Sequence, residues 1–380
     1  MIDLREKFAL ADELTPPDLW QEARKRAANQ PSVASVEERL TNRPRRRLAA
    51  ATVAIVIFAA AGIFAWNVLA PPKEKAIVPS PIPTAPVRPL AITGTLMLPF
   101  GDFGIVAGAN SVWVASYGHV LRVDPTSMTV TASIRVPGLG DQGGIAIGTD
   151  VWVTDTSHHE VVAIDPVTAR IVRRVRVPHL PVQVVADGQH VWVISATNGA
   201  GRIYGIDGST GVVTPRGQLL TYPKLPFTAG GGSAWVAEGG VLRRIGSDGS
   251  TATVQLSGGE PSALTFGDGS VWALSTGGGI LRIDPSSGHT ISSIPTPSGI
   301  GLAEAAGRVW ILTDTGSRSK TVYIPDPRDP SLVLSFDADT GQPVGRAVKV
   351  GFSPAWIAAE GADAWVASYN AARLLRISTA

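Results

Sequence analysis

The chain has 380 residues, of which 44% are hydrophobic and 17% charged, and its formal net charge is +2. It contains no cysteine, which excludes disulfides, thiolate metal sites and cysteine nucleophiles. Its 41 glycines and 29 prolines indicate many turns and favour an all-β fold over a helical one.

The charge is unevenly distributed along the chain. Residues 1–47 hold ten Lys and Arg against eight Asp and Glu, whereas residues 91–380 hold twenty against twenty-two, a net charge of −2. The larger part of the chain therefore has no excess of basic side chains that would attract phosphates, and we expect no nucleic-acid partner.

The first segment, residues 1–47, is too short to bury a hydrophobic core of its own. We expect a short cytoplasmic tail that folds weakly or against the membrane surface. A docking site for a cytoplasmic partner is the alternative.

The next 23 residues, 48–70, contain no charged side chain. About 20 apolar residues suffice to cross a bilayer as a helix. Four arginines between Arg43 and Arg47 precede the segment, and by the positive-inside rule they place the N-terminus in the cytoplasm. We therefore predict a transmembrane signal-anchor helix at 48–70. A cleavable signal peptide is the alternative, although the apolar run is long and begins late in the chain.

Residues 71–90 contain seven prolines. Such a segment is stiff and extended, largely of polyproline II character. We predict a linker that holds the rest of the chain on the extracytoplasmic side of the cell membrane.

The part from 91 to 380 contains seven copies of one unit. Each copy has a tryptophan strand, then a strand that ends near an Asp-Pro or Asp-Gly turn, then two further short strands. Four strands per repeat of about 40 residues are typical of a β-propeller blade. The tryptophans lie 39, 40, 43, 37, 38 and 55 residues apart, at Trp113, Trp152, Trp192, Trp235, Trp272, Trp310 and Trp365.

The two ends of this part complement each other. The last copy lacks its outer strand, and an additional strand at 91–99 precedes the first copy. We therefore predict an all-β, seven-bladed propeller over 91–380 that is closed by the N-terminal strand and has no open sheet edge between blades. We also expect the propeller to be monomeric.

The repeated residues have structural roles. A large ring at the same point of every blade is expected to pack against the neighbouring blade. The repeated aspartates are expected to accept backbone N–H bonds in tight turns; they are Asp124, Asp165, Asp207, Asp284 and Asp337.

The second repeat, "VWVTDTSHHEVVAIDPVTARIVRRVRVP", resembles the YVTN-type propeller repeat of bacterial proteins and is similar to the repeats of NHL proteins and of streptogramin lyase. This resemblance covers about 290 residues of the chain, from 91 to 380. It implies membership of a superfamily that includes ligand sensors, scaffolds, lyases, lactonases and quinoprotein-like dehydrogenases. Fold alone does not choose among these functions.

Function is expected where the repeats differ. The loops after the tryptophan strands and the loops that lead into the inner strands emerge on one face of the ring, which we call the loop face. A ring of polar residues three positions after each tryptophan begins these loops. We predict ligand contacts from Tyr117, His119, Asp155, His158, Glu160, Glu238, Asp314, Arg318, Tyr369 and Asn370.

Blade six contains an insertion, because its tryptophan lies 55 residues before the next one. The inserted segment combines Arg318, Lys320, Tyr323 and Arg328 with prolines. Long loops of this kind are often lids or contact surfaces, and a variable loop without function is the alternative.

We favour a non-enzymatic, membrane-anchored module that binds a small molecule, glycan or protein on the loop face, with no metal and no cofactor. The alternative is a metal-dependent lyase or lactone hydrolase resembling streptogramin lyase, whose family uses a His and Glu pair with magnesium. Asp155, His158 and Glu238 are the candidate ligands here, but the family motif has no residue-by-residue match. A quinoprotein-like dehydrogenase is a third hypothesis, for which the cofactor-stacking motif is absent.

Overall fold

The computed structural model describes residues 89–379 with nine gaps. Every regular element in this part of the chain is a β-strand, and no helix in it is long and apolar enough to cross a membrane. The predicted tail 1–47, the predicted helix 48–70 and all but the end of the predicted linker lie outside the described residues. The gaps are 100, 141–142, 198–199, 220–224, 314–316, 319–322, 325–330, 352–353 and 369–371.

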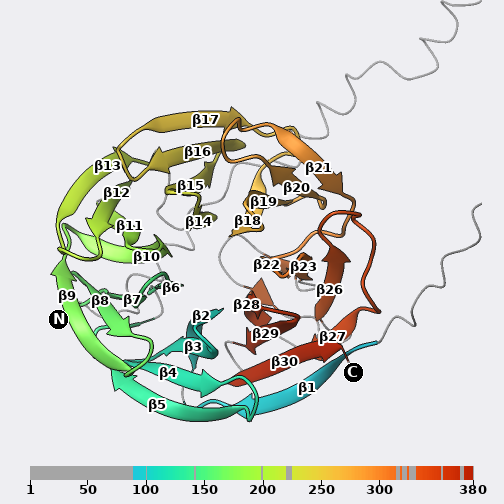
Figure 1. Ribbon diagram of the computed structural model, residues 1–380, viewed down its shortest axis with the longest axis horizontal. Helices are drawn as coiled ribbons and strands as arrows, with labels where there is room; N and C mark the ends of the chain where they lie inside the picture. The colour runs from blue at the N-terminus through green and yellow to red at the C-terminus, as the bar shows by residue number, and fades with distance from the viewer. Residues whose placement is uncertain are drawn as a thin grey trace, which may run out of the picture. The chain divides into compact units, whose positions relative to one another are not determined.

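Seven four-stranded antiparallel sheets stand around a central axis (Figure 1), which confirms the predicted seven-bladed β-propeller. Within each blade the innermost strand lies beside the channel and the tryptophan strand is second. The chain then runs outward through a third and an outer strand, and it crosses to the inner strand of the next blade.

From the inner to the outer strand, blades 1 to 4 have the following elements. Blade 1 contains β2 (Asp102–Gly108), β3 (Ser111–Ser116), β4 (His119–Asp124) and β5 (Thr129–Arg135); blade 2 contains β6 (Ile145–Ile147), β7 (Val151–Asp155), β8 (Glu160–Asp165) and β9 (Arg170–Arg176). Blade 3 contains β10 (Leu180–Asp187), β11 (His190–Thr197), β12 (Ala200–Asp207) and β13 (Val213–Gln218); blade 4 contains β14 (Phe227–Gly230), β15 (Ser233–Glu238), β16 (Val241–Gly246) and β17 (Thr251–Gln255).

Blades 5 to 7 follow the same order. Blade 5 contains β18 (Pro261–Gly267), β19 (Ser270–Ser275), β20 (Ile280–Ile283) and β21 (Thr290–Ile294); blade 6 contains β22 (Gly301–Ala305), β23 (Arg308–Leu312), β26 (Ser331–Asp337) and β27 (Val348–Gly351). Blade 7 contains β28 (Pro354–Glu360), β29 (Asp363–Ser368), β30 (Arg373–Thr379) and β1 (Leu90–Met97); the insertion of blade 6 carries a short hairpin of β24 (Ser317–Arg318) and β25 (Tyr323–Ile324).

Blade 7 is built from both ends of the described chain. Its outer strand β1 pairs antiparallel with β30, with Leu90 opposite Thr379 and Met97 opposite Arg373. The two strands lie side by side at the lower edge of the ring in Figure 1. Seven backbone pairings thereby join the first strand of the propeller to its last.

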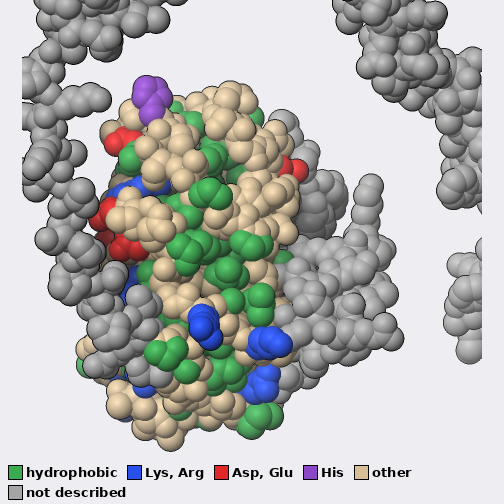
Figure 2. Space-filling view, turned by 90° about the vertical axis from the view of Figure 1, so that its right-hand side faces the viewer, with side chains coloured by type: hydrophobic (Ala, Val, Ile, Leu, Met, Phe, Trp, Pro, Cys, Tyr) green, Lys and Arg blue, Asp and Glu red, His purple; other side chains and the backbone are tan. Residues whose placement is uncertain are grey.

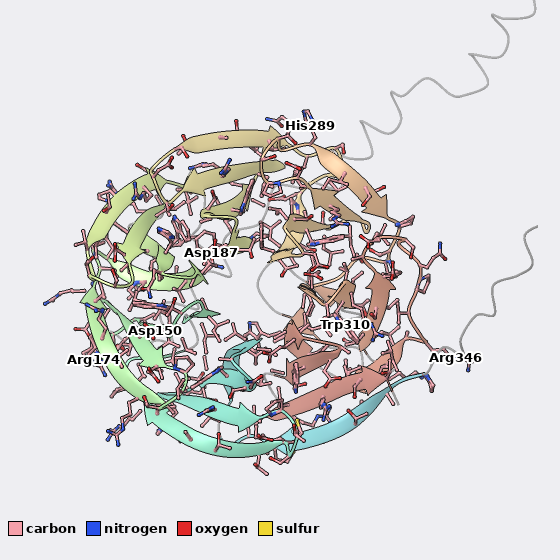
Figure 3. The ribbon with its side chains drawn as sticks, in the orientation of Figure 1. Asp150, Arg174, Asp187, His289, Trp310 and Arg346 are labelled. Carbon is pink, nitrogen blue, oxygen red and sulfur yellow. The ribbon has the colours of Figure 1, made fainter. Side chains whose placement is uncertain are left out.

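The tryptophans are buried between blades, as predicted. All seven are at most 2% exposed. Trp113 of blade 1, for example, packs in one cluster with Val151 and Val153 of blade 2. Trp310 of blade 6, labelled in Figure 3, packs in the same way in one cluster with Val366 and Leu375 of blade 7. Large rings bury about 150–250 Å² each, so these contacts hold neighbouring blades together.

The repeated aspartates make turns between third and outer strands, as predicted. Asp165 is representative: its Oδ1 atom accepts hydrogen bonds from the backbone N–H of Val167 at 2.9 Å, from the backbone N–H of Thr168 at 2.6 Å and from the Thr168 hydroxyl at 2.9 Å. The same bonding around Asp284 lowers the pKa of its carboxyl to about 2, because Ser286 and Ser287 donate to the ionised form.

An arginine stacks on the tryptophan in three blades. In blade 1, Arg122 lies opposite Trp113 in the sheet, and its guanidinium carbon is 5.6 Å from the ring centroid. Its Nε donates to Ser111 at 2.9 Å and its Nη1 donates to the carbonyl of Val167 in the next blade at 3.2 Å. Arg244 and Arg282 stack in the same way in blades 4 and 5.

Blade 3 places its arginine differently. The residue opposite Trp192 is Gly205, and the side chain of Arg216 from the outer strand crosses over it. Arg216 then donates to the carbonyl of Ser247 in blade 4 at 2.8 Å. The contact to the next blade is therefore preserved although a different strand supplies the cation.

Hydrophobic side chains on the outside of the ring are scattered among polar ones. Figure 2 shows this for the side that carries β21, β26 and β27. Ile291 of β21 is 55% exposed, between the exposed Thr290 and the partly buried Ser292 on the same strand. Single exposed apolar residues of this kind are normal for a soluble surface.

Candidate functional site

The loop face of blades 1 and 2 is held together by one connection between them. The backbone N–H of Gly118, in the turn after the first tryptophan strand, donates to the carbonyl of Leu139 at 2.9 Å. The backbone N–H of Thr156, in the corresponding turn of blade 2, donates to the carbonyl of Gly138 at 3.1 Å. The segment 136–140 therefore bridges the two turns and fixes their spacing.

Asp155 is the centre of the blade 2 turn. Its side chain is fully buried. Its Oδ1 atom accepts hydrogen bonds from Nδ1 of His158 at 2.7 Å and from the backbone N–H of His158 at 3.2 Å. Its Oδ2 atom is 3.4 Å from Nη1 of Arg174. A carboxylate with both oxygens bonded in this way shapes the turn and orients the imidazole.

Glycine at position 138 allows the bridging segment to approach this turn. A Cβ atom there would overlap Oδ1 of Asp155 and would lie 2.9 Å from Nδ1 of His158. Any larger residue would have to displace either the carboxylate or the ring. At Gly140, two residues along, a Cβ atom would meet nothing within 4 Å.

We call the groups on and beside these two turns the Tyr117–His158 surface: Tyr117, segment 136–140, of which Pro137 is exposed while Val136, Gly138 and Leu139 are buried, His158, Glu160 and Arg174. The side chain of His158 is 56% exposed, and Tyr117 is 50% exposed. Glu160 lies 3.3 Å from Arg174, which stands at the outer rim of blade 2 (Figure 3). Four of the ten predicted contact residues thus lie in or beneath one surface.

Other predicted residues belong to separate blades. Glu238 of blade 4 pairs with Arg243 of the same blade at 2.9 Å. His119 of blade 1 contacts the hydroxyl of Ser133 through Nδ1 at 3.1 Å. Within the described ranges of 89–379, no group of three or more His, Asp or Glu side chains is placed to hold a metal ion.

The side chains of four predicted contact residues are not among those that the structure describes. Asp314, Tyr369 and Asn370 lie outside the described residues, and for Arg318 the structure describes the backbone in β24 and not the side chain. The prediction that they bind a ligand stays a prediction.

The polar residues three positions after each tryptophan are mostly inside the protein. Ser116, Ser195 and Ser368 are fully buried, and their hydroxyls have no partner among the described residues. They end the tryptophan strands below the surface, so the loops beyond them, and not this ring, form the accessible part of the loop face.

The seven inner strands surround a central channel of about 580 Å³. Its wall is built in layers, because equivalent residues of each inner strand pair with equivalent residues of the tryptophan strand. The layer that pairs with the residue before each tryptophan consists of Ala107, Ile147, Ala186, Ala229, Phe266, Glu304 and Ala359.

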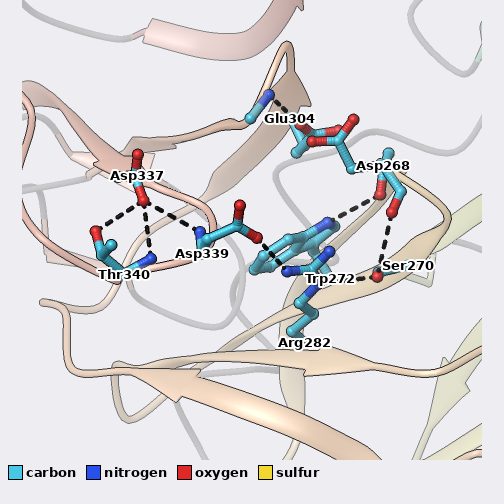
Figure 4. Close-up of polar contacts among 10 residues, drawn as sticks. Asp268, Ser270, Trp272, Arg282, Glu304, Asp337, Asp339 and Thr340 are labelled. Carbon is cyan, nitrogen blue, oxygen red and sulfur yellow. Dashed lines mark hydrogen bonds and ion pairs between the residues drawn. The ribbon is translucent and has the colours of Figure 1, made fainter.

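Glu304 is the one charged residue among the described residues that line this channel. It precedes the turn between β22 and β23, at the end of the channel opposite the loop face. Burial, the adjacent negative charge of Asp268 and a hydrogen bond with that carboxyl raise the pKa of Glu304 to about 7, against the opposing effects of the Gly307 N–H and Arg282 (Figure 4).

Sequence reasoning missed Glu304, although a signal was present. When the copies are aligned on tryptophan, the residue six positions earlier is Ala in five blades, Phe in blade 5 and Glu in blade 6. A single charged residue in an otherwise apolar column marks a local departure from the repeat.

Comparison with known proteins identifies the fold. No protein-family model and no curated protein sequence matches the chain. Among solved structures, 1425 chains match. The β-propeller domain of Cps50 (Swd1) from Myceliophteria thermophila is 13% identical, with a TM-score of 0.57 over 77% of this chain and 100% of that one. BamB from Moraxella catarrhalis is 15% identical, with a TM-score of 0.51 over 76% of this chain and 99% of that one. Identities this low support the fold and nothing more specific.

Proposed function

We propose that this chain is a membrane-anchored, extracytoplasmic β-propeller that binds a ligand or another protein on its loop face. The Tyr117–His158 surface carries this proposal. Tyrosine and arginine are enriched at the energetic centres of protein interfaces, and here they flank a histidine on a rigid support. The buried Asp155 orients both His158 and Arg174, so binding does not require these groups to become ordered first.

The charges of this surface support a polar partner. Arg174 is shared between the buried Asp155 and the partly exposed Glu160, so it retains capacity to donate outward. Tyr117 contributes an exposed ring beside segment 136–140. A glycan or a polypeptide loop presents the hydroxyls, carbonyls and apolar faces that such a combination recognises.

Site-specific crosslinking in the cells that produce the protein tests this binding. A photoreactive residue at position 117 of the full chain should give a discrete crosslinked product. The matched control is position 167, because Val167 is 79% exposed but lies in the turn between the third and outer strands, at the opposite end of the blade. Equal products from both positions, or none from position 117, would contradict the proposal.

The membrane anchor is part of the same proposal and rests on the uncharged segment 48–70 and the arginines before it. The full chain should remain with membranes after alkaline carbonate washing, and deletion of 48–70 should release it. Protease added outside spheroplasts should digest the C-terminal propeller. A carbonate-soluble full chain or a protected propeller would refute the anchor without affecting the binding surface.

A second function is favoured by the pair of Asp155 and His158. A buried carboxylate that accepts a hydrogen bond from Nδ1 leaves Nε2 of the ring as the nitrogen that can exchange a proton with a ligand. This arrangement suits general acid or base catalysis in a lyase or lactone hydrolase. Lactone hydrolysis by the full chain that is lost in His158→Gln and kept in His159→Asn would support it, and absence of turnover on a lactone panel would eliminate it.

A further inference from the structure

We propose that the central channel binds an organic ammonium ligand, with the carboxyl group of Glu304 as its counter-ion and the aliphatic and aromatic side chains of the channel around its hydrocarbon part. This site lies at the end of the channel opposite the Tyr117–His158 surface and is independent of the function proposed for that surface.

The first argument is the position of Glu304. In the six equivalent places around the channel the side chains are alanine, isoleucine or phenylalanine. A carboxyl group at such a position loses hydration on folding, which is unfavourable unless a partner compensates. Among the described residues, the backbone N–H of Gly307 donates to it at 3.2 Å, and its other hydrogen-bond partner is the carboxyl of Asp268, which carries the same charge.

The second argument is the room made for the carboxyl group. A Cβ atom on Gly267 of the neighbouring inner strand would overlap Oε2 of Glu304. In blade 4 the equivalent Gly230 faces the Phe266 ring. Blade 6 therefore seats a carboxyl group where blade 5 seats an apolar ring.

The third argument is the adjacent Asp268. Its carboxyl hydrogen-bonds to that of Glu304, and burial together with the negative charge of Asp268 raises the pKa of Glu304 to about 7. The positive charge of Arg282 acts in the opposite direction, but Arg282 stacks on Trp272 at 5.0 Å and pairs with Asp339 at 2.9 Å (Figure 4). An external cation beside Glu304 would favour the ionised form of this carboxyl.

The size of the channel and the side chains that line it favour an organic cation over a metal ion. A volume of about 580 Å³ is within the range of small-molecule sites. Phe227 and Trp356 line the channel nearer the loop face than Glu304 does, and Phe266 lines it in the same layer as Glu304. These rings can contact the hydrocarbon part of a ligand whose ammonium group pairs with Glu304. Magnesium and calcium require six or more oxygen ligands, and this wall does not supply them from its described side chains. An amine with an apolar body fits these groups better than a hydrated metal ion does.

Calorimetric titration of the full chain with phenethylamine tests the proposal. Binding at about pH 8 should have a dissociation constant of the order of millimolar, as expected for so small a ligand. At about pH 5 it should weaken by about a hundredfold, because nearly all Glu304 is then protonated. In two buffers of different ionisation enthalpy at about pH 6, about one proton should be released per ligand bound.

Three controls separate the outcomes. 2-Phenylethanol has the same size without the charge and should not bind. Glu304→Gln should abolish amine binding, and Glu360→Gln, a carboxyl change one position later in blade 7, should leave it unaltered. Equal binding of amine and alcohol, equal binding by wild type and Glu304→Gln, or no binding of phenethylamine at pH 8 would overturn the proposal. The comparison of amine binding at different pH values uses the unmodified protein. It therefore tests the proposal even if a variant fails to fold.

Discussion

Nδ1 of His158 lies 2.7 Å from Oδ1 of Asp155, so a side chain that is 56% exposed is fixed by one that is fully buried. This relationship converts a flexible surface turn into a rigid one. Replacing Asp155 by alanine should lower the free energy of unfolding by about 2–3 kcal/mol, because the buried carboxylate that accepts from the backbone and ring of His158 and from Arg174 is lost. Urea unfolding of the full chain, followed by tryptophan fluorescence, measures the difference.

Glu160→Ala is the matched control for that measurement. Glu160 shares Arg174 with Asp155, but its side chain is 27% exposed, and a pair of this kind contributes about 0–1 kcal/mol. If the two variants proved equally stable, the buried carboxylate would not organise the turn.

Alanine substitutions at two glycines of segment 136–140 should have different effects on stability. Gly138→Ala should destabilise the protein by about 1–3 kcal/mol, because its methyl group would overlap Asp155. Gly140→Ala should be neutral or slightly stabilising, because its methyl group meets nothing within 4 Å and the unfolded chain loses freedom. Thermal unfolding of the two variants side by side distinguishes them, and a neutral Gly138→Ala would contradict the close approach described above.

Arg282 should contribute to stability more than its surface ion pair suggests. Arg282→Ala removes the stacking on Trp272, a hydrogen bond to Ser270 and the pair with Asp339, at a cost of about 1–2 kcal/mol. Asp339 is 85% exposed, so Asp339→Ala should change stability by less than about 0.5 kcal/mol. Chemical denaturation measures both, and equal losses would mean that the ion pair and not the stacking matters.

The pKa of Glu304 predicts a dependence of stability on pH. In the folded protein this pKa is about 7, above its ordinary value of 4.5. Between these values the folded state binds more protons than the unfolded state, so this residue lowers stability as pH rises through the window and adds no further change above it. Glu304→Gln should remove that part of the decline in urea midpoint between about pH 5 and about pH 8. A decline of unchanged size in the variant would assign the effect to other groups.

Much of the fold followed from the repeat. The seven tryptophans recur in register, and a large apolar ring at a fixed point in each copy is compatible with burial between blades whatever the neighbours are. The aspartates act within their own turns, so local chemistry alone predicted the bonding seen at Asp165. These features depend on short stretches of chain and were therefore visible in the sequence.

The candidate site was less predictable. Asp155 stood among polar turn residues and was expected at the surface, but segment 136–140 covers it in the folded protein. The roles of the arginines in blades 1 and 3 were also not visible in the sequence, because Arg122 and Arg216 donate to turn carbonyls of the next blade from different strands. An alignment of the repeats compares residues at the same position of each copy. It therefore does not show that side chains from two different strands take the same place in the fold.

The sequence by itself determined how many blades form, which strand of each is central and where the turns fall, because periodicity and turn chemistry act over a few residues. Only the tertiary structure decided which charged groups meet. Glu304 and Asp268 come from adjacent blades, and the raised pKa of Glu304 depends on how close the packing of these blades brings the two carboxyl groups. Electrostatic coupling and desolvation depend on such distances, which no stretch of one blade specifies.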